Sequence, residues 1–186
     1  MLSQRPATDP LTHVEHPATS PRPRLRVLVV LGEGGHTRQM LTLLDQLGPQ
    51  YDYHYLMADQ DRLSEAQIRL PGPVYRVRRP RTKVEGRTDP LPVALLQTLR
   101  SLFEVWPLLR RIRPDVVLAN GPSVAVPVVL LGKLAGARVI WLETASRVYS
   151  LSASARIVYP LADLFIVQWP QLRQRYPKAV YAGRLL

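Results

Sequence analysis

Short apolar runs rich in β-branched residues alternate along the chain with segments whose apolar residues recur at helical spacing. The apolar runs predict strands at residues 25–31, 51–57, 74–78, 115–119, 138–142 and 163–167. The helical spacing predicts a helix that ends at Leu47, and further helices at residues 61–70, 91–112, 124–135 and 152–161. Strands that alternate with helices predict an α/β fold, with a parallel sheet covered by helices on both faces.

The longest predicted helix, at residues 91–112, is expected to bury one apolar face and to kink at Pro107. The residues assigned to that face are Leu95, Leu99, Leu102, Phe103, Trp106 and Leu109. Residues 79–90 predict a polar, basic loop. Residues 1–24 are rich in Pro and have no hydrophobic period, so they predict a disordered tail before one folded domain at residues 25–186.

The composition is that of a globular protein, with 186 residues of which 46% are hydrophobic and 21% charged. Two full nucleotide-binding domains of roughly 150 residues each do not fit this length, so a self-contained two-domain transferase is not expected. The absence of Cys excludes disulfides, thiolate metal ligands and a Cys nucleophile. The sequence has no run of about 20 mainly apolar residues that would predict a membrane span.

The formal net charge of +11 favours anionic partners, namely nucleic acid, phosphorylated substrates or an acidic membrane surface. Basic residues crowd one predicted strand end and loop: Arg76, Arg78, Arg79, Arg81, Lys83 and Arg87. This cluster is suited to anionic lipid head groups, although each residue taken singly is also typical of a solvated surface. The sequence lacks the interleaved aromatic and basic residues of an RNA-binding motif, so nucleic acid is not expected as a partner.

A glycine-rich turn, Gly32 to Thr37 (GEGGHT), joins the first predicted strand to the first helix. Glycines let the backbone approach an anion, and the helix N-terminus offers free N–H groups, so the turn predicts a phosphate or diphosphate cradle. The alternative is a tight turn that needs Gly only for its backbone angles. His36 is a candidate phosphate donor or general base, or it caps or packs the helix. The turn does not match a dinucleotide fingerprint, because Thr37 stands at the third glycine position, and it is not a P-loop.

Two further polar turns follow predicted strands, at Asn120 to Ser123 (NGPS) and at Glu143 to Arg147 (ETASR). All three turns fall at the carboxyl edge of the predicted sheet, where open parallel sheets bind ligands. Polar loops at that edge are also an ordinary feature of the fold. Glu143 is a candidate to accept hydrogen bonds from a sugar or to pair with Arg147, or it orients the loop. No cluster of His, Asp and Glu has metal-ligand spacing, so no metal is expected.

The chain resembles a known family on segments that contain these turns. The family is the acceptor-binding subunit of the split UDP-N-acetylglucosamine transferase of asparagine-linked glycosylation, with bacterial counterparts in exopolysaccharide and capsule synthesis. The matching segments are LGEGGHTRQML at residues 31–41, NGPSVAVP at 120–127, ETASRVYSLSASARIVYPLADLFIVQWPQL at 143–172 and YPKAVYAGRLL at 176–186. The resemblance implies a Rossmann-like domain over residues 25–186, equivalent to the N-terminal half of a GT-B glycosyltransferase.

The resemblance also implies a non-autonomous subunit that binds a lipid-diphosphate-linked sugar acceptor and recruits a separate chain that binds the UDP-sugar, without a cofactor. His36 and Glu143 are then the catalytic candidates. The residues expected to contact the acceptor or its diphosphate are Gly32, Gly34, Gly35, Thr37, Asn120, Gly121, Ser123 and Arg147.

Eukaryotic members of the family carry a membrane-spanning N-terminal helix, whereas this chain has a polar tail. A peripheral position on the cytoplasmic face of an anionic membrane is therefore expected. Two other functions stay open at this point. One is a scaffold that only anchors and activates a catalytic partner, and the other is a stand-alone nucleotide-binding protein.

Overall fold

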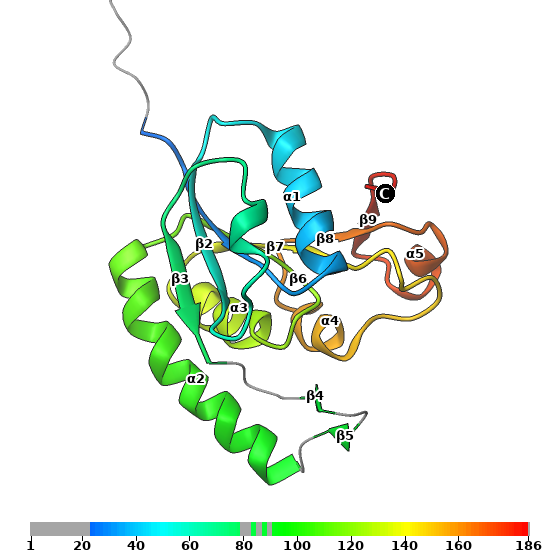
Figure 1. The fold of residues 1–186 in the computed structure, drawn as a ribbon. Helices are drawn as coiled ribbons and strands as arrows, with labels where there is room; N and C mark the ends of the chain where they lie inside the picture. Colours follow the sequence, from blue (N-terminus) through cyan, green and yellow to red (C-terminus); the bar gives the residue numbers. More distant parts are fainter. Residues whose placement is uncertain (1–22, 79–82, 85–86, 89–90, 186) are drawn as a thin grey trace, which may run out of the picture.

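The computed structural model describes residues 23–78, 83–84, 87–88 and 91–185 (Figure 1). The strands are β1 (Arg26–Val30), β2 (Asp52–Ala58), β3 (Val74–Val77), β4 (Lys83–Val84), β5 (Arg87–Thr88), β6 (Val116–Asn120), β7 (Arg138–Leu142), β8 (Leu164–Val167) and β9 (Ala179–Tyr181). The helices are α1 (Gly35–Leu47), α2 (Leu91–Ile112), α3 (Ala125–Leu134), α4 (Ala153–Val158) and α5 (Gln171–Arg175). The tail predicted at residues 1–24 lies outside the described residues, apart from its last two.

Seven of the strands form one parallel sheet in the order β3-β2-β1-β6-β7-β8-β9, and β4 pairs with β5 in a separate antiparallel ribbon. The chain builds outward from β1 to β3, returns to lie beside β1 as β6, and then builds in the opposite direction. The strand order therefore reverses between β1 and β6. Open parallel sheets bind ligands in a crevice at the carboxyl edge of the sheet, at the point where the strand order reverses.

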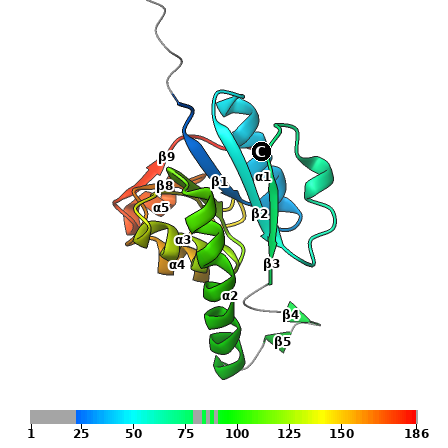
Figure 2. The ribbon, with the colours of Figure 1, turned by 90° about the vertical axis from the view of Figure 1, so that its left-hand side faces the viewer.

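Each face of the sheet has its own hydrophobic core, because alternate strand residues point to opposite faces. In β1, Val27 and Val29 pack in the core beneath α1, whereas Leu28 and Val30 belong to the core shared with α2, α3 and α4. Figure 2 shows α1 on one side of the sheet and these three helices on the other. The predicted α/β fold, with a parallel sheet between two helical layers, is thus confirmed.

Three shorter segments differ from the prediction. Residues 61–70 form only a 3₁₀ turn, Glu65–Gln67, because the Asp61 carboxylate accepts the N–H groups of Leu63 (3.2 Å) and Ser64 (3.0 Å) and so competes with a helix. The described part of the predicted loop at 79–90 is the ribbon of β4 and β5. The elements α5 and β9 were not predicted, since five and three residues are too short to show a period.

The bounds predicted for α2 are correct, but the face assigned to the core is only partly right: Leu109 is buried as predicted, whereas other residues of that face are exposed. The residues of α2 that the structure shows as buried are Ser101, Val105, Leu109 and Ile112, of which the last three belong to the hydrophobic core on that side of the sheet. Leu99 and Phe103, assigned to the core, are 45% and 81% exposed. The helix has apolar residues on two opposite sides, so its period alone did not show which side faces the sheet.

Among the helices in the described ranges, none has the length and apolar character needed to cross a bilayer.

Candidate functional site

The loops after β1 and β6 meet at the point where the strand order reverses. The Asn120 side chain donates a hydrogen bond from Nδ2 to the carbonyl of His36 at 2.9 Å. Gly32 lies so close to the second loop that a Cβ there would approach Pro122 Cγ to 2.9 Å. The structure thus brings together two of the predicted turns, at the carboxyl edge of the sheet where this topology favours a ligand-binding crevice.

The glycine turn presents an open helix N-terminus. Gly34 precedes α1 with a φ of 60°, a conformation that favours Gly, and Gly35 is the first residue of the helix. Both glycines are exposed, and a Cβ built on either meets nothing within 4 Å. The first N–H groups of a helix have no partners within it, and they carry the positive end of its dipole. This arrangement can bind an anionic group such as a phosphate.

The His36 ring is half-buried and lies against Gly121, where a Cβ would overlap the imidazole. Its Nδ1 is enclosed and has no hydrogen-bond partner among the described residues, as is also true of Asn120 Oδ1. Burial lowers the pKa of His36 from its ordinary value of 6.5. The imidazole is therefore neutral at pH 7, with one nitrogen able to accept a proton and the other able to donate one.

Thr37 was expected on the ligand side of the turn, but the structure places it beneath the turn. Its side chain is fully buried, and its Oγ1 lies 2.6 Å from the Ser64 Oγ. Ser64 in turn donates to the carbonyl of Gly32 at 3.1 Å. The two hydroxyls support the glycine turn from below. Ser64 was not among the predicted site residues, because it lies in a segment assigned to a helix.

Glu143 follows β7 at the same edge but is completely buried. Its carboxylate accepts hydrogen bonds from Trp141 Nε1 at 3.2 Å, and from Ser152 N at 3.4 Å and Oγ at 3.3 Å. Burial raises the pKa of Glu143, and these hydrogen bonds act in the opposite direction. The geometry favours the interpretation that Glu143 orients the loop and the start of α4, rather than contacting a sugar. Arg147 is exposed at the end of this loop.

A buried pair of glutamines ties this loop to α1 and to the end of β8. Gln168, directly after β8, donates from Nε2 to Gln39 Oε1 on α1 at 2.6 Å and to the Glu143 carbonyl at 3.1 Å. Gln39 Oε1 also accepts the Ala145 N–H at 3.0 Å. Neither residue was among the predicted site residues, because a Gln on a helix is typical of the surface. The position of Gln168 just after a strand was the available signal.

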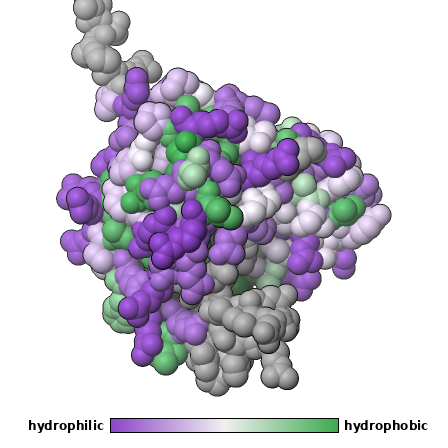
Figure 3. All heavy atoms as spheres, viewed as in Figure 1, coloured by the Kyte–Doolittle hydropathy of each residue, from purple (hydrophilic) through white to green (hydrophobic). Residues whose placement is uncertain are grey.

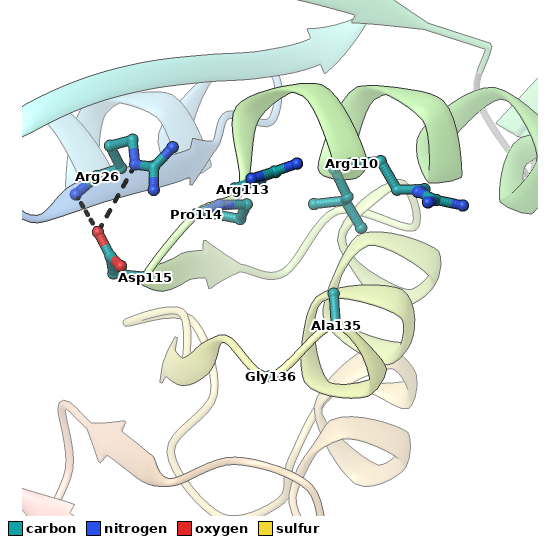
Figure 4. A pocket seen from close by; sticks show the side chains of 8 residues that line it. Arg26, Arg110, Arg113, Pro114, Asp115, Ala135 and Gly136 are labelled. Atoms are coloured by element: carbon teal, nitrogen blue, oxygen red, sulfur yellow. Dashed lines mark hydrogen bonds and ion pairs between the residues drawn. The ribbon is translucent and has the colours of Figure 1, made fainter.

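A hollow at the opposite edge of the sheet is lined by several arginines (Figure 4). Arg26 contacts Asp115, with Nε 3.9 Å from Oδ2, and it donates from Nη1 to the Ile112 carbonyl at 2.9 Å. These contacts join the end of α2 to the start of β1, which indicates a structural role.

Within the described ranges, no three His, Cys, Asp or Glu side chains are grouped so as to hold a metal ion.

Comparison with known proteins identifies the family to which this chain belongs. The family model described as "Oligosaccharide biosynthesis protein Alg14 like" matches residues 27–185. The UDP-N-acetylglucosamine transferase subunit ALG14 of Homo sapiens is 40% identical over 187 aligned positions, which cover 90% of this chain and 86% of that protein. The subunit of the same name from Schizosaccharomyces pombe is 34% identical over 175 positions, which cover 84% of this chain and 81% of that protein.

Solved structures are similar in fold. MurG of Acinetobacter baumannii superposes with a TM-score of 0.64 at 20% identity, covering 87% of this chain and 44% of MurG. The UDP-GlcNAc 2-epimerase of Neisseria meningitidis gives a TM-score of 0.63 at 17% identity, covering 87% of this chain and 47% of the epimerase. The chain thus spans about half the length of the solved structures it matches. At these identities the likeness establishes the fold alone, as one Rossmann-like half of larger proteins.

Proposed function

Because this chain belongs to the Alg14 family of oligosaccharide biosynthesis proteins, we propose that it is the acceptor-binding subunit of a glycosyltransferase. Its reaction transfers a sugar from a UDP-sugar to a lipid-diphosphate-linked sugar, in polysaccharide or lipid-linked oligosaccharide synthesis. The observation that carries this proposal is the open N-terminus of α1 beside His36, whose Nδ1 has no partner in the described part of the chain, at the edge between β1 and β6.

The acceptor's diphosphate is proposed to lie against Gly34 and Gly35. The free N–H groups of the helix stabilise its negative charge, and the glycines leave room for it. Asn120 and Gly121 form the facing wall of the crevice. Ser123 is half-buried in the same loop, and the exposed Arg147 is a further cation at this edge of the sheet.

His36 is proposed to contact the acceptor hydroxyl that attacks the anomeric carbon of the donor sugar. A neutral imidazole can take up the hydroxyl proton as the new glycosidic bond forms, while UDP leaves with the electron pair of the broken bond. Glu143 acts as a positioning residue in this proposal, because its carboxylate is occupied by Trp141 and Ser152. No metal or other cofactor is invoked.

The donor sugar is proposed to bind on a separate partner chain. The relatives are named transferase subunits, and the fold corresponds to about half of each matched structure, which supports a catalytic crevice completed by a second Rossmann-like domain. Since the acceptor is lipid-linked, the complex works at the surface of a membrane. The strongly basic composition, with a net charge of +11, suits an anionic one.

The test is equilibrium binding by the chain alone, with a water-soluble short-chain lipid diphosphate that carries one sugar as the probe. We expect this acceptor analogue to bind and a UDP-sugar to bind much more weakly. Gly35→Asp adds a carboxylate at the open side of the turn, and we expect it to weaken acceptor binding by about tenfold or more, equivalent to about 1.4 kcal/mol. The matched control is Gly35→Asn, which has nearly the same shape without the charge and should bind almost normally.

The two alternative functions give different results in this assay. Preferential binding of the UDP-sugar contradicts the proposal and favours a stand-alone nucleotide-binding protein. Binding of neither ligand, by a chain that still assembles with a donor-binding partner, favours a scaffold.

A further inference from the structure

We propose that the outer face of α2, formed by Leu96, Leu99, Phe103 and Trp106, is the surface with which this protein docks on an anionic lipid bilayer. Leu96, Leu99 and Phe103 are 51%, 45% and 81% exposed, and Trp106 is half-buried. Their spacing of three, four and three residues places them in one stripe along the helix. In Figure 3, apolar groups interrupt the hydrophilic surface at the lower left, where Figure 1 places α2.

Among the described residues, this stripe belongs to neither hydrophobic core. Val105, Leu109 and Ile112, on the opposite side of α2, pack into the core between the helix and the sheet. At about 100° per residue, Phe103 lies about 160° around the helix axis from Val105 and about 120° from Leu109. The helix therefore carries two apolar sides, of which the sheet covers one. An unpaired apolar stripe of this kind on a helix marks an interaction surface.

Charge favours a lipid surface as the occupant. Between residues 96 and 112 the helix carries Arg100, Arg110 and Arg111, all exposed, against one acidic residue, Glu104. Glu104 is neutralised by Arg78, whose Nε lies 3.5 Å from its Oε1. An apolar stripe flanked by guanidinium groups is the pattern of helices that lie in the interface of anionic membranes.

The end of the stripe has the chemistry of the head-group region. The Arg110 guanidinium lies over the Trp106 ring, 5.9 Å from its centre. Indole rings are favoured at the boundary between lipid tails and head groups, and the long Arg side chain can extend from that depth to a phosphate. Insertion of Phe103 and Leu99 would therefore leave Trp106 and Arg110 at the level of the head groups.

The stripe also lies near the edge of the sheet at which the proposed acceptor site is found. Figures 1 and 2 show the first half of α2 extending past the end of β3, on the side where the parallel strands end. The crevice with His36 opens at that same edge. Docking through α2 would therefore hold this edge close to the bilayer. Only this link between the stripe and the acceptor site rests on the proposed function, because binding to vesicles requires neither acceptor nor partner chain.

The experiment is cosedimentation of the full chain with vesicles of phosphatidylcholine alone or with 30% phosphatidylglycerol, at low and high salt. We expect binding to the anionic vesicles only, weakened by salt. Leu99→Ser combined with Phe103→Ser should reduce binding by at least about tenfold. The matched control is Leu130→Ser combined with Leu134→Ser, which removes two exposed leucines from α3 and should leave binding within about twofold of the wild type.

Trp fluorescence gives a second readout that does not depend on the yield of the variants. Brominated lipid should quench part of the emission, and Trp106→Phe should abolish that quenching. The proposal is overturned if the Leu99/Phe103 variant binds vesicles like the wild type, or if the α3 control loses binding equally. Loss of partner assembly without loss of vesicle binding would identify the stripe as a protein interface instead.

The two proposals can fail separately. Transfer to a water-soluble short-chain acceptor by the complex with the partner chain should be unchanged in the Leu99/Phe103 variant. Failure of the acceptor-binding function would instead leave vesicle binding intact while the acceptor analogue does not bind.

Discussion

Replacing His36 with alanine is expected to lower the turnover of the complex with its donor-binding partner by roughly 10²–10⁴-fold, the range for loss of a general base. Folding and partner binding should be retained, because the Nδ1 of the ring has no hydrogen-bond partner among the described residues. The measurement is sugar transfer to a short-chain acceptor, with complex formation checked by size-exclusion chromatography. Near-normal turnover by an intact complex would assign His36 a purely structural role.

The pH dependence of turnover distinguishes a general base at position 36 from a residue that only packs. Burial lowers the pKa of His36 below 6.5, so the imidazole is neutral at pH 7 and becomes protonated only at more acidic pH. Turnover of the wild type should therefore fall as the pH falls through that lowered pKa, and His36→Ala should lack this acidic limb. The control is His54→Ala in β2, whose ring contacts Tyr75 away from the crevice and whose loss should leave the limb in place.

Gly121→Ala is expected to reduce turnover by about 10²-fold or more, because small displacements of a catalytic group have effects of that size. Gly121 has a φ of 30°, and an added Cβ would overlap the His36 imidazole. The ring must therefore move, and the backbone strain adds about 1–3 kcal/mol of destabilisation.

Gly136→Ala separates these two effects. Gly136 also has a left-handed φ, of 90°, but a Cβ there meets nothing within 4 Å. This variant should lower the free energy of unfolding in denaturant titrations while turnover stays close to normal. If both alanine variants retained turnover equally, the position of His36 against Gly121 would have no catalytic importance.

The sequence predicted the architecture well, because parallel strands buried on both faces form apolar runs that end at polar turns. Those turns also located the crevice, since the carboxyl ends of parallel strands share one edge. Hydrophobic period alone did not identify the core side of α2, because its Phe103 side and its Val105 side are both apolar. Which side is buried depends on how α2 packs against the sheet, and the spacing of apolar residues within the helix does not contain that information.

The roles of individual polar residues were harder to predict than their location. Thr37 and Glu143 lie at the expected edge, yet both are buried and bonded to other parts of the protein. Gln39 and Gln168 are 129 positions apart and become partners only through the fold. Sequence position thus identifies which loop a side chain belongs to, whereas its orientation towards solvent or core depends on contacts with distant segments.

We propose above that this chain supplies the acceptor half of a two-chain transferase. The most direct test purifies this chain and a donor-binding partner separately, and measures sugar transfer from a UDP-sugar to a short-chain acceptor with each alone and with both. We expect transfer only when both chains are present. The Gly35→Asp variant should raise the acceptor KM of the mixture more than the KM for the UDP-sugar. Robust transfer by this chain alone, or a mixture in which Gly35→Asp affects only the donor KM, would contradict the proposal.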